Sequence, residues 1–385
     1  MISTPHTWIS WCGTALAAAA ALYAVLAYYA MRTRIGVHGS ARGEPPPVTV
    51  LKPLCGAEQE LYSCLRSFCD QDYPRFQIVF GVSDAADPAI AVVARLRREF
   101  PHLELKLAVD RRLHGTSRKV SNLINMMPLA RHEVLVIADS DVRVGRDYLA
   151  RVVAPLEDRR VGVVTCSYVG APGPGLWSLL GSLFINDWFT PSVRVAALFG
   201  SRAFSFGATI AIRREVLARI GGFAAIASQL ADDYRLGELT RALGLATVLS
   251  DVVVETCVDE PSFGQLVRHE LRWLRTIRTV RPLGYALSFV TFGVPVAAMG
   301  AVLAGGARSA IAWLTLTALA RGMLHLRRPD GGLPTVRQLL VLPLRDALTV
   351  GLWAWGFATR RVHWRHDSFH VTRDGSADPV VRDAA

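Results

Sequence analysis

An uncharged N-terminal run constrains this chain more than any other feature, because no Lys, Arg, Asp or Glu occurs before Arg32. The stretch Trp8–Met31 is long enough to cross a hydrocarbon core of roughly 30 Å as a helix. We therefore predict a transmembrane anchor over residues 1–31. A cleaved signal peptide is the alternative, since the alanines at 17–21 resemble a cleavage region, but the basic residues that open such peptides are missing.

Basic residues that follow the anchor indicate its orientation. Cytoplasmic flanks of membrane helices are enriched in Lys and Arg, so we expect the segment after the anchor to lie in the cytoplasm. Hydrophobic residues make up 51% of the 385 residues and charged residues 19%, which favours further membrane segments. The basic residues are Arg32, Arg34, Arg42 and Lys52.

The C-terminal part of the chain is again apolar, and we predict membrane helices over residues 282–359 followed by a polar tail, 360–385. Residues 282–307 carry no charge and residues 309–326 carry only Arg321, so they are expected to form a membrane hairpin.

A third apolar stretch, residues 338–359, is interrupted by Arg345 and Asp346. This adjacent pair is expensive in lipid unless it faces other helices or water. The stretch therefore either spans the membrane or lies in the interface.

Between the proline-containing linker, residues 32–47, and residue 281, short apolar runs alternate with helical patterns. This order predicts an α/β domain over residues 48–281, in which helices cover both faces of a largely parallel sheet. Such sheets place ligands at the carboxyl ends of their strands. The strands are expected at 48–54, 76–83, 104–109, 134–138 and 161–168, with helices at 58–70 and 88–100.

The net charge of +11 suits phosphate groups or anionic lipid head groups. No aromatic RNA-binding signature accompanies it, so no nucleic-acid partner is expected. The first predicted strand is not followed by GxGxxG, which argues against a dinucleotide-binding dehydrogenase. The six cysteines form no CxxC pair, which indicates reduced thiols rather than a disulfide framework or a zinc site.

Two carboxylates arrive together at the end of the apolar strand 134–138, in the sequence Asp139-Ser140-Asp141. Both can turn toward one cation, and ligation by oxygen alone suits Mg²⁺ or Mn²⁺ bound to phosphate oxygens. Asp-Ser-Asp is also common in turns, so a simple turn is the alternative.

Two further acidic sites lie at the end of a predicted strand and at the start of a predicted helix. Asp84 lies at the end of strand 76–83 and is a candidate to bind a nucleobase or ribose, whereas Asp87 is expected to cap the helix behind it. Asp232 and Asp233 begin a helical pattern, where capping explains both. Alternatively, one of them caps and the other faces a cleft as general base.

A final cluster, His269, Arg272 and Trp273, lies on one face of a predicted helix before the membrane segments. Arg272 is a candidate to bind a diphosphate and Trp273 to stack on a sugar or lipid. Arg and Trp also serve as interfacial anchors.

The acids and the Arg-Trp pair occur in the order and roughly at the spacing of the D, D, D, (Q/R)xxRW signature of family 2-like and family 21 glycosyltransferases. The chain most resembles the ceramide glucosyltransferase group over about residues 10–365. Its bacterial hopanoid-pathway members are similar in length and in Ala/Arg-rich composition. Supporting motifs are Val82-Ser-Asp-Ala-Ala-Asp-Pro88, Arg118-Lys119-Val-Ser-Asn122, Asp139-Ser-Asp-Val-Arg143 and Gly207-Ala-Thr209.

The resemblance implies a GT-A fold that binds a UDP-sugar and a divalent metal, Mg²⁺ or Mn²⁺. Asp84 would contact uridine, Asp139 and Asp141 the ribose, metal and diphosphate, and Asp233 would be the catalytic base. Lys119, His269, Arg272 and Trp273 would complete the donor site. His269 stands where the signature has Gln or Arg, and Asp141 stands where eukaryotic-type members have Gly.

The implied reaction is an inverting transfer to a hydroxyl of a membrane lipid, giving a β-glycoside at a bacterial inner membrane. UDP-N-acetylglucosamine and a bacteriohopanetetrol-type hopanoid are the expected substrates, with UDP-glucose and ceramide or another lipid as the alternative. A processive polysaccharide synthase shares the aspartates and the Arg-Trp pair. A catalytically inactive nucleotide-sugar-binding scaffold is the non-enzymatic alternative.

Overall fold

A computed structural model describes residues 5–33, 36–37, 43–203, 205–326, 336–358, 361–364, 367–371 and 377–379. The chain divides into two compact units. We call residues 1–34, 172–200 and 260–364 the helical unit, and residues 35–171, 201–259 and 365–385 the sheet unit. The predicted domain boundaries at 47/48 and 281/282 stay a prediction.

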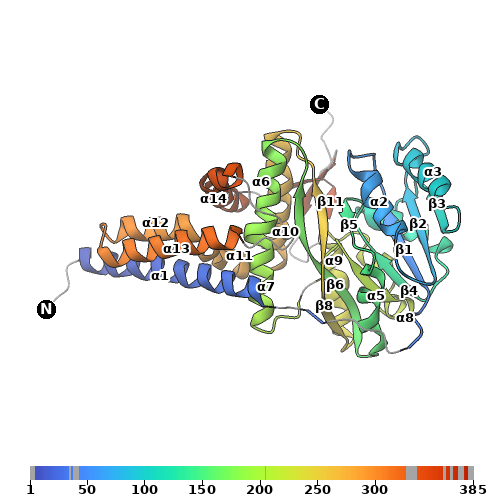
Figure 1. Cartoon of the computed structure of the whole chain (residues 1–385), viewed down its shortest axis with the longest axis horizontal. Helices are drawn as coiled ribbons and strands as arrows, with labels where there is room; N and C mark the ends of the chain where they lie inside the picture. Colours follow the sequence, from blue (N-terminus) through green and yellow to red (C-terminus); the bar gives the residue numbers. More distant parts are fainter. Residues whose placement is uncertain are drawn as a thin grey trace. The chain divides into compact units, whose positions relative to one another are not determined.

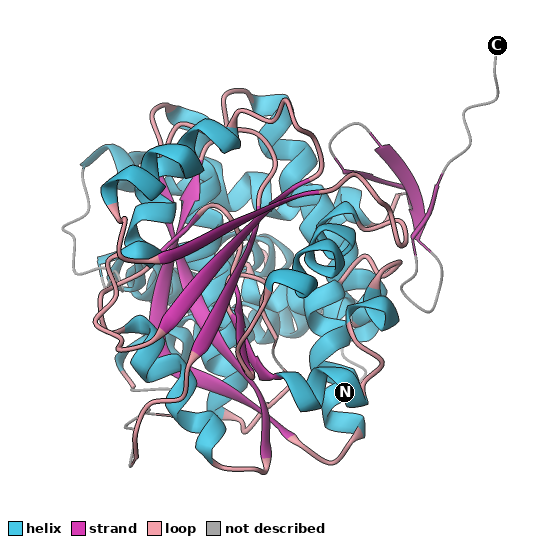
Figure 2. Ribbon diagram, turned by 90° about the vertical axis from the view of Figure 1, so that its right-hand side faces the viewer, coloured by secondary structure: helices cyan, strands magenta, loops and turns pink. Residues whose placement is uncertain are grey.

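The sheet unit is built on one eight-stranded sheet with the order β3-β2-β1-β4-β7-β6-β8-β5. The first four strands in this order are parallel, whereas β7 is antiparallel to β4 and β6, and β5 is antiparallel to β8. Figure 2 shows these strands as a twisted sheet. Their bounds are β1 Val48–Pro53, β2 Phe76–Val82, β3 Glu104–Val109, β4 Val134–Ile137, β5 Val142–Arg143, β6 Val161–Pro172, β7 Ile210–Arg213 and β8 Ala246–Val258.

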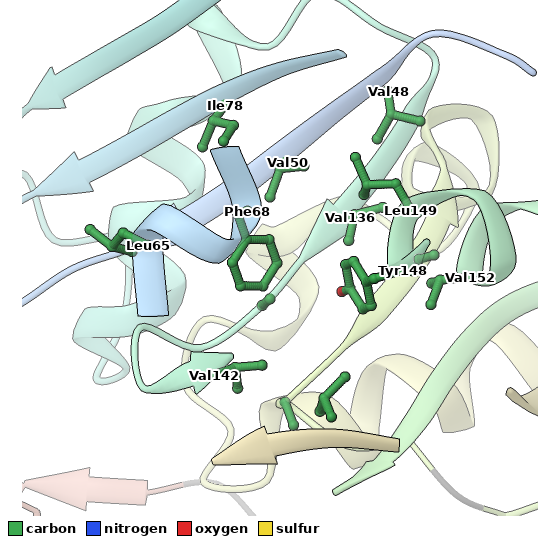
Figure 3. Packing of buried hydrophobic residues seen from close by; sticks show 14 of the residues in the cluster. Val48, Val50, Leu65, Phe68, Ile78, Val136, Val142, Tyr148, Leu149 and Val152 are labelled. Carbon is green, nitrogen blue, oxygen red and sulfur yellow. The ribbon is translucent and has the colours of Figure 1, made fainter. Parts of the chain in front are cut away.

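Successive residues of the central strands enter two separate apolar cores, as expected when helices cover both faces of a sheet. In β4, Val134 and Val136 belong to one core, and Leu135 and Ile137 belong to the other. Figure 3 shows the first core, in which Phe68 packs edge-on against Tyr148 with ring centroids 5.4 Å apart.

Six α-helices of the sheet unit supply these cores. Helices α2, α3 and α5 contribute to the first core, and α4, α8 and α9 to the second. The helices are α2 Leu61–Cys69, α3 Ala89–Glu99, α4 Arg118–Met126, α5 Tyr148–Val153, α8 Arg214–Arg219 and α9 Asp232–Ala242. The 3₁₀ segments are η1 Met127–Leu129, η2 Ala154–Glu157 and η4 Phe223–Ile226.

The helical unit contains nearly all of the remaining helices. Figure 1 shows α1, α12 and α13 running alongside one another, and these three helices contact each other pairwise. The bounds are α1 Pro5–Arg32, α6 Leu176–Phe184, α7 Thr190–Leu198, α10 Phe263–Val280, α11 Pro282–Leu287, α12 Gly293–Leu303, α13 Arg308–Leu326 and α14 Val336–Gly356. A π-helical segment η3, Ile185–Phe189, joins α6 to α7, and a 3₁₀ segment η5, Ser288–Thr291, precedes α12.

Two helices of the described chain, Thr7–Arg32 and Val336–Gly356, are long and apolar enough to cross a membrane. A third span is possible by length if Pro282–Thr291 and Gly293–Leu303, which meet at a bend of 74°, count as one segment. Membrane-type helices at both ends of the chain are therefore confirmed. The expected hairpin arm, residues 309–326, is helical in α13 but is not among the helices that are apolar enough to cross a membrane.

Small residues allow α1 and α12 to approach closely. A Cβ atom on Gly13 would lie 2.5 Å from the carbonyl oxygen of Gly300, and a Cβ on Gly300 would lie 2.5 Å from the carbonyl oxygen of Gly13. Glycine is therefore the residue that fits at both positions. Close backbone contact through small residues is a typical way for membrane helices to associate.

The C-terminal residues form three short strands, β9 Arg361–Trp364, β10 Asp367–Val371 and β11 Ala377–Pro379. Strands β10 and β11 pair antiparallel, so part of the predicted polar tail is structured. Arg34 and Arg42, which supported the predicted orientation, lie outside the described residues.

Candidate active site

Asp139 lies two residues beyond the end of β4, close to the predicted strand end, and a buried lysine fixes its backbone. The ammonium group of Lys52, in β1, donates to the carbonyl oxygen of Asp139 at 2.5 Å and lies 3.8 Å from the centroid of the Phe68 ring. Burial lowers the pKa of Lys52 to about 8. Lys52 was expected to lie as a charge beside the membrane, but its side chain is fully buried in the sheet unit.

A second lysine lies between the acids. The Nζ atom of Lys119 is 2.5 Å from Oδ1 of Asp139 and 3.8 Å from Oδ2 of Asp232. Burial opposes the charged form of Lys119, but the charges of Asp139 and Asp232 outweigh it and raise the pKa of the ammonium group. Lys119 is therefore a fixed positive charge beside the predicted metal ligands.

Asp141 is held by β8. Its Oδ2 atom accepts a hydrogen bond from the hydroxyl of Thr256 at 2.7 Å, and its carbonyl oxygen accepts one from the amide of Cys257 at 2.8 Å. Burial, together with the charge of Asp139, raises the pKa of Asp141. A bound cation would offset this repulsion between the two carboxylates.

Asp233 is fixed by two backbone amides rather than acting as a simple helix cap. Its Oδ2 atom accepts from the amide of Gly207 at 2.8 Å, and its Oδ1 atom accepts from the amide of Tyr234 at 2.7 Å. Burial and the charge of Asp232 raise the pKa of Asp233 to about 6. Helix α9 begins at Asp232, and its N-cap residue, Ala231, forms no side-chain capping hydrogen bond.

Gly207 brings three of these groups around one small space. A Cβ atom at this position would lie 3.0 Å from Oδ2 of Asp139, 3.0 Å from Nζ of Lys119 and 3.5 Å from Oδ2 of Asp233. The absence of a side chain at Gly207 therefore leaves these polar atoms facing a common point.

Asp84 lies at the end of β2 and is exposed. Its Oδ1 atom accepts from the amide of Ala86 at 2.9 Å, a local turn contact that is compatible with a ligand at the other oxygen. Asp87 accepts from the amide of Ala89, the first residue of α3, at 2.9 Å. Asp87 also accepts from the amide of Gly56, so it joins two loops in addition to capping the helix.

His269, Arg272 and Trp273 lie on α10, in the helical unit. The Nδ1 atom of His269 is 2.6 Å from Oε1 of Glu260, and its ring meets Trp273 edge-on with centroids 5.0 Å apart. Trp273 also packs among the apolar side chains around Phe184. Trp273 therefore packs inside the helical unit, and the roles of the three side chains toward a substrate stay predictions.

The carboxylates of Asp139 and Asp141 are donors of the kind that bind a divalent cation together with water and phosphate ligands. Both offer hard oxygen donors, and Asp139 can pair with Lys119 through Oδ1 and still present Oδ2. Within the described ranges, no group of three or more His, Cys, Asp and Glu residues could hold a metal ion. Further ligands would have to come from the substrate and from water.

Three contacts of this site were missed by sequence reasoning. They are the ammonium of Lys52, the amide of Gly207 and the hydroxyl of Thr256. The position of Lys52 inside the apolar run 48–54 could have indicated that its side chain is buried in the sheet unit. Gly207 and Asp233 are 26 residues apart, and Thr256 and Asp141 are 115 residues apart. No local sequence pattern indicates either contact.

Comparison with known proteins gives the following relationships. A model of glycosyl transferase family 21 matches residues 13–377. The ceramide glucosyltransferase of Komagataella phaffii is 34% identical over 113 residues, which are 28% of this chain and 22% of that protein. Ceramide glucosyltransferase 1 of Caenorhabditis elegans is 24% identical over 217 residues, which are 56% of this chain and 46% of that protein. The chain thus spans less than half the length of either relative.

Among solved structures, the mannosyltransferase PcManGT from Pyrobaculum calidifontis, in complex with GDP-Man and Mn²⁺, superposes with a TM-score of 0.52 at 22% identity. The match covers 91% of this chain and 95% of that one. It shows a GT-A-like glycosyltransferase fold and confirms the predicted fold class.

Proposed function

Because the chain belongs to glycosyl transferase family 21, we propose that it is a membrane-bound, inverting glycosyltransferase that moves a sugar from a UDP-sugar to a hydroxyl of a membrane lipid. The ceramide glucosyltransferases among its relatives support a lipid acceptor. The observation that carries the proposal is the arrangement around Gly207, where the carboxylate of Asp233 and the Asp139–Lys119 pair face one small space.

In the proposed reaction, Asp233 is the general base. It accepts the proton of the acceptor hydroxyl while the hydroxyl oxygen forms a bond to the anomeric carbon, and the bond from that carbon to the UDP oxygen breaks. One displacement inverts the configuration, so a UDP-α-sugar gives a β-glycoside. The amides of Gly207 and Tyr234 fix the Asp233 carboxylate, which supports this role because a positioned base transfers protons efficiently.

Positive charge is needed where the diphosphate leaves. Lys119 supplies one ammonium group beside Asp139 in the sheet unit. We propose that Asp84 binds the uridine and that Arg272 and Trp273, with His269, contact the donor or the lipid. The resemblance of these positions to the D, D, D, (Q/R)xxRW signature supports these assignments.

Asp139 and Asp141 are the proposed ligands of a divalent cation, Mg²⁺ or Mn²⁺. Such a cation, when bound, would neutralise part of the diphosphate charge. The presence of Mn²⁺ in the structure of PcManGT supports metal use on this fold. Isothermal titration of the purified protein with Mn²⁺ should show binding that Asp139→Ala removes, and undiminished transfer in the presence of chelator would contradict an essential metal.

For the substrates, we propose UDP-N-acetylglucosamine as donor and a bacteriohopanetetrol-type hopanoid as acceptor. UDP-glucose with ceramide or another lipid is the alternative, and the relatives named as ceramide glucosyltransferases support it. The purified, nanodisc-embedded protein should be tested with both donors against hopanoid, ceramide and diacylglycerol, with mass detection of the glycolipid.

The outcomes of this experiment separate the candidate functions. A single β-linked glycolipid supports the proposal and identifies its substrates. A polymeric product would indicate a processive polysaccharide synthase instead. Donor binding without UDP release from any donor and lipid pair would indicate a nucleotide-sugar-binding scaffold.

We also propose a bacterial inner-membrane location with the sheet unit facing the cytoplasm. Exposed residues of α3 test the orientation, because a cysteine introduced at Arg98 should resist an impermeant thiol reagent in intact cells and react after lysis. The same substitution should be made in a variant without the exposed Cys12 and Cys55. Ready labelling in intact cells would show that the sheet unit faces away from the cytoplasm.

A further inference from the structure

Two thiols far apart in the sequence meet beside Asp141. The Sγ atom of Cys64, in α2, lies 3.2 Å from the Sγ atom of Cys257, in β8, although 193 residues separate them. A disulfide bond requires an Sγ–Sγ distance of about 2.05 Å, so an approach of about 1 Å would join the two sulfur atoms. From this geometry we propose that Cys64 and Cys257 form a reversible disulfide that acts as a redox modification site beside the donor site.

The surroundings of Cys257 favour reaction with a small oxidant. Cys257 is partly exposed, whereas Cys64 is fully buried. The guanidinium group of Arg143 lies 3.8 Å from Sγ of Cys257, through Nη2. Of the two thiols, only Cys257 is accessible to a small oxidant. Cys257 is therefore the attacking thiol and Cys64 the resolving thiol.

Arg143 is itself held in place. Its Nη2 atom donates to Oε2 of Glu60 at 3.0 Å and to Oγ of Ser63 at 3.3 Å, and its Nη1 atom lies 3.6 Å from Oε2 of Glu255. These contacts connect β5 with the start of α2 on one side and with β8 on the other. The two cysteines thus lie on elements that are already held together, so little chain movement is needed to join them.

The oxidant that balances the reaction is a peroxide. The sulfur of Cys257 attacks one peroxide oxygen, the O–O bond breaks, and the thiol proton passes to the departing oxygen, so that sulfenic acid and water form. The Cys64 thiol then attacks the sulfenic sulfur and displaces a second water, which leaves the disulfide. Two thiols are oxidised and one hydrogen peroxide is reduced to two waters. A thiol reductant reverses the reaction by thiol–disulfide exchange.

Oxidation has a direct route to the proposed active site. Cys257 donates its amide to the carbonyl oxygen of Asp141, and the preceding residue, Thr256, donates its hydroxyl to the Asp141 carboxylate. Drawing Cys257 toward α2 therefore displaces the groups that orient Asp141. A misplacement of about 1 Å in an active site can reduce the rate on the order of 10²-fold. This consequence rests on the proposed function, whereas formation of the bond does not.

The test uses the full-length protein in nanodiscs, fully reduced and then exposed to hydrogen peroxide. Peptide mapping by mass spectrometry should find a peptide that links Cys64 to Cys257, and a thiol reductant should remove it. Transfer should fall by about tenfold or more on oxidation and recover on reduction. Cys64→Ser and Cys257→Ser should each lose this response, whereas the matched control Cys166→Ser, which replaces another buried cysteine, should keep it.

Peptide mapping of the oxidised parent protein, which carries no substitution, tests the proposal even if a serine variant fails to fold. Irreversible oxidation of Cys257 without the linked peptide, or a linkage through Cys55 instead, would overturn it. A linked peptide with unchanged transfer would overturn the regulatory consequence. If the reduced protein transfers no sugar to any lipid, the proposed function fails, but the mass map still shows whether the bond forms.

Discussion

Arg345 and Glu270 form a bidentate ion pair that joins α14 to α10. Nη1 and Nη2 of Arg345 lie 2.6 and 2.8 Å from the two carboxylate oxygens of Glu270, and the side chains are 1% and 5% exposed. The neighbouring acid, Asp346, pairs instead with Arg321 of α13 at 2.9 Å. The adjacent charges that make residues 338–359 costly in lipid therefore have separate partners on other helices.

Breaking one side of the Arg345–Glu270 pair should destabilise the helical unit. Arg345→Met leaves a buried carboxylate without its partner, and such changes cost about 3–5 kcal/mol in the free energy of unfolding. The double variant Arg345→Met, Glu270→Leu removes both charges and should regain most of the loss. Thermal unfolding in detergent measures both, with the exposed Arg337→Gln as control. Equal losses in the single and double variants would show that the pair is not the source of the effect.

Asp233, rather than Asp232, should be the residue whose charge is needed for transfer. Asp233→Asn keeps the side-chain shape but removes the base, so turnover should fall on the order of 10²- to 10⁴-fold. Affinity for the UDP-sugar should stay near that of the parent, because the loss is confined to the transition state. Asp232→Asn is the matched control and should be much milder, since Asp232 is not among the acids that face the space around Gly207. Steady-state kinetics and equilibrium binding separate the two effects.

A wrong assignment would be visible in the same measurements. Near-normal turnover in Asp233→Asn would show that another group accepts the proton. Loss of UDP-sugar binding as the main defect would instead give Asp233 a role in holding the donor.

Turnover should depend on pH through Asp233. Burial raises the pKa of this carboxyl group to about 6, and only its ionised form can accept a proton. Activity should therefore be fully present well above pH 6 and should be lost as the pH falls through about 6. The measurement is kcat as a function of pH at saturating substrates. The residual activity of Asp233→Asn should not fall in this way at low pH. If it does, a group other than Asp233 causes the loss of activity at low pH.

Lys52 should support the site without contacting substrate. Lys52→Met keeps the length of the side chain but leaves the carbonyl oxygen of Asp139 without this hydrogen bond, at a cost of about 1–3 kcal/mol in stability. Because Asp139 then loses its fixed position, the KM for the donor should also rise. Lys106→Met removes a lysine with a 42% exposed side chain and is the control for general loss of charge. A stable Lys52→Met protein with parental KM would contradict this role.

The sequence predicted the first half of the sheet well because buried parallel strands are continuous apolar runs. The expected strands at 48–54, 76–83 and 104–109 differ from β1, β2 and β3 by at most one residue at an end. The antiparallel half was harder to predict. Strand β7, Ile210–Arg213, is only four residues long. Strand β8 has four consecutive buried residues before buried and half-buried residues alternate, and no turn signal in the sequence identifies its partner strand.

The acidic motif residues were visible in the sequence because each follows a recognisable strand or begins a helical pattern. Their partners were not visible, because contacts such as Thr256 with Asp141 join distant segments. The grouping of residues 172–200 with the helical unit was also unpredicted. An apolar helix such as α6 has the same composition whether it packs in a soluble core or among membrane helices.

The His269–Glu260 contact leads to the last prediction. Nδ1 of His269 lies 2.6 Å from Oε1 of Glu260, whose side chain is 7% exposed, and the amide of Glu260 donates to Oγ of Ser178 at 2.9 Å. A carboxylate at Nδ1 fixes the ring and leaves Nε2 to face other groups. His269 occupies the position at which the resembled signature carries Gln or Arg, and a Gln amide can also donate to Glu260. His269→Gln should therefore keep transfer within about tenfold of the parent, which corresponds to about 1.4 kcal/mol in activation free energy.

His269→Ala separates the structural role of this ring from a chemical one. It leaves the buried Glu260 carboxylate without its donor, which should lower the stability by about 1–3 kcal/mol, whereas His269→Gln should unfold near the parental temperature. The exposed His102→Gln is the control for loss of an imidazole. If His269→Gln is stable and binds the donor but transfers no sugar, the imidazole itself takes part in the reaction. If both variants are as active and stable as the parent, the contact with Glu260 has no role in positioning α10.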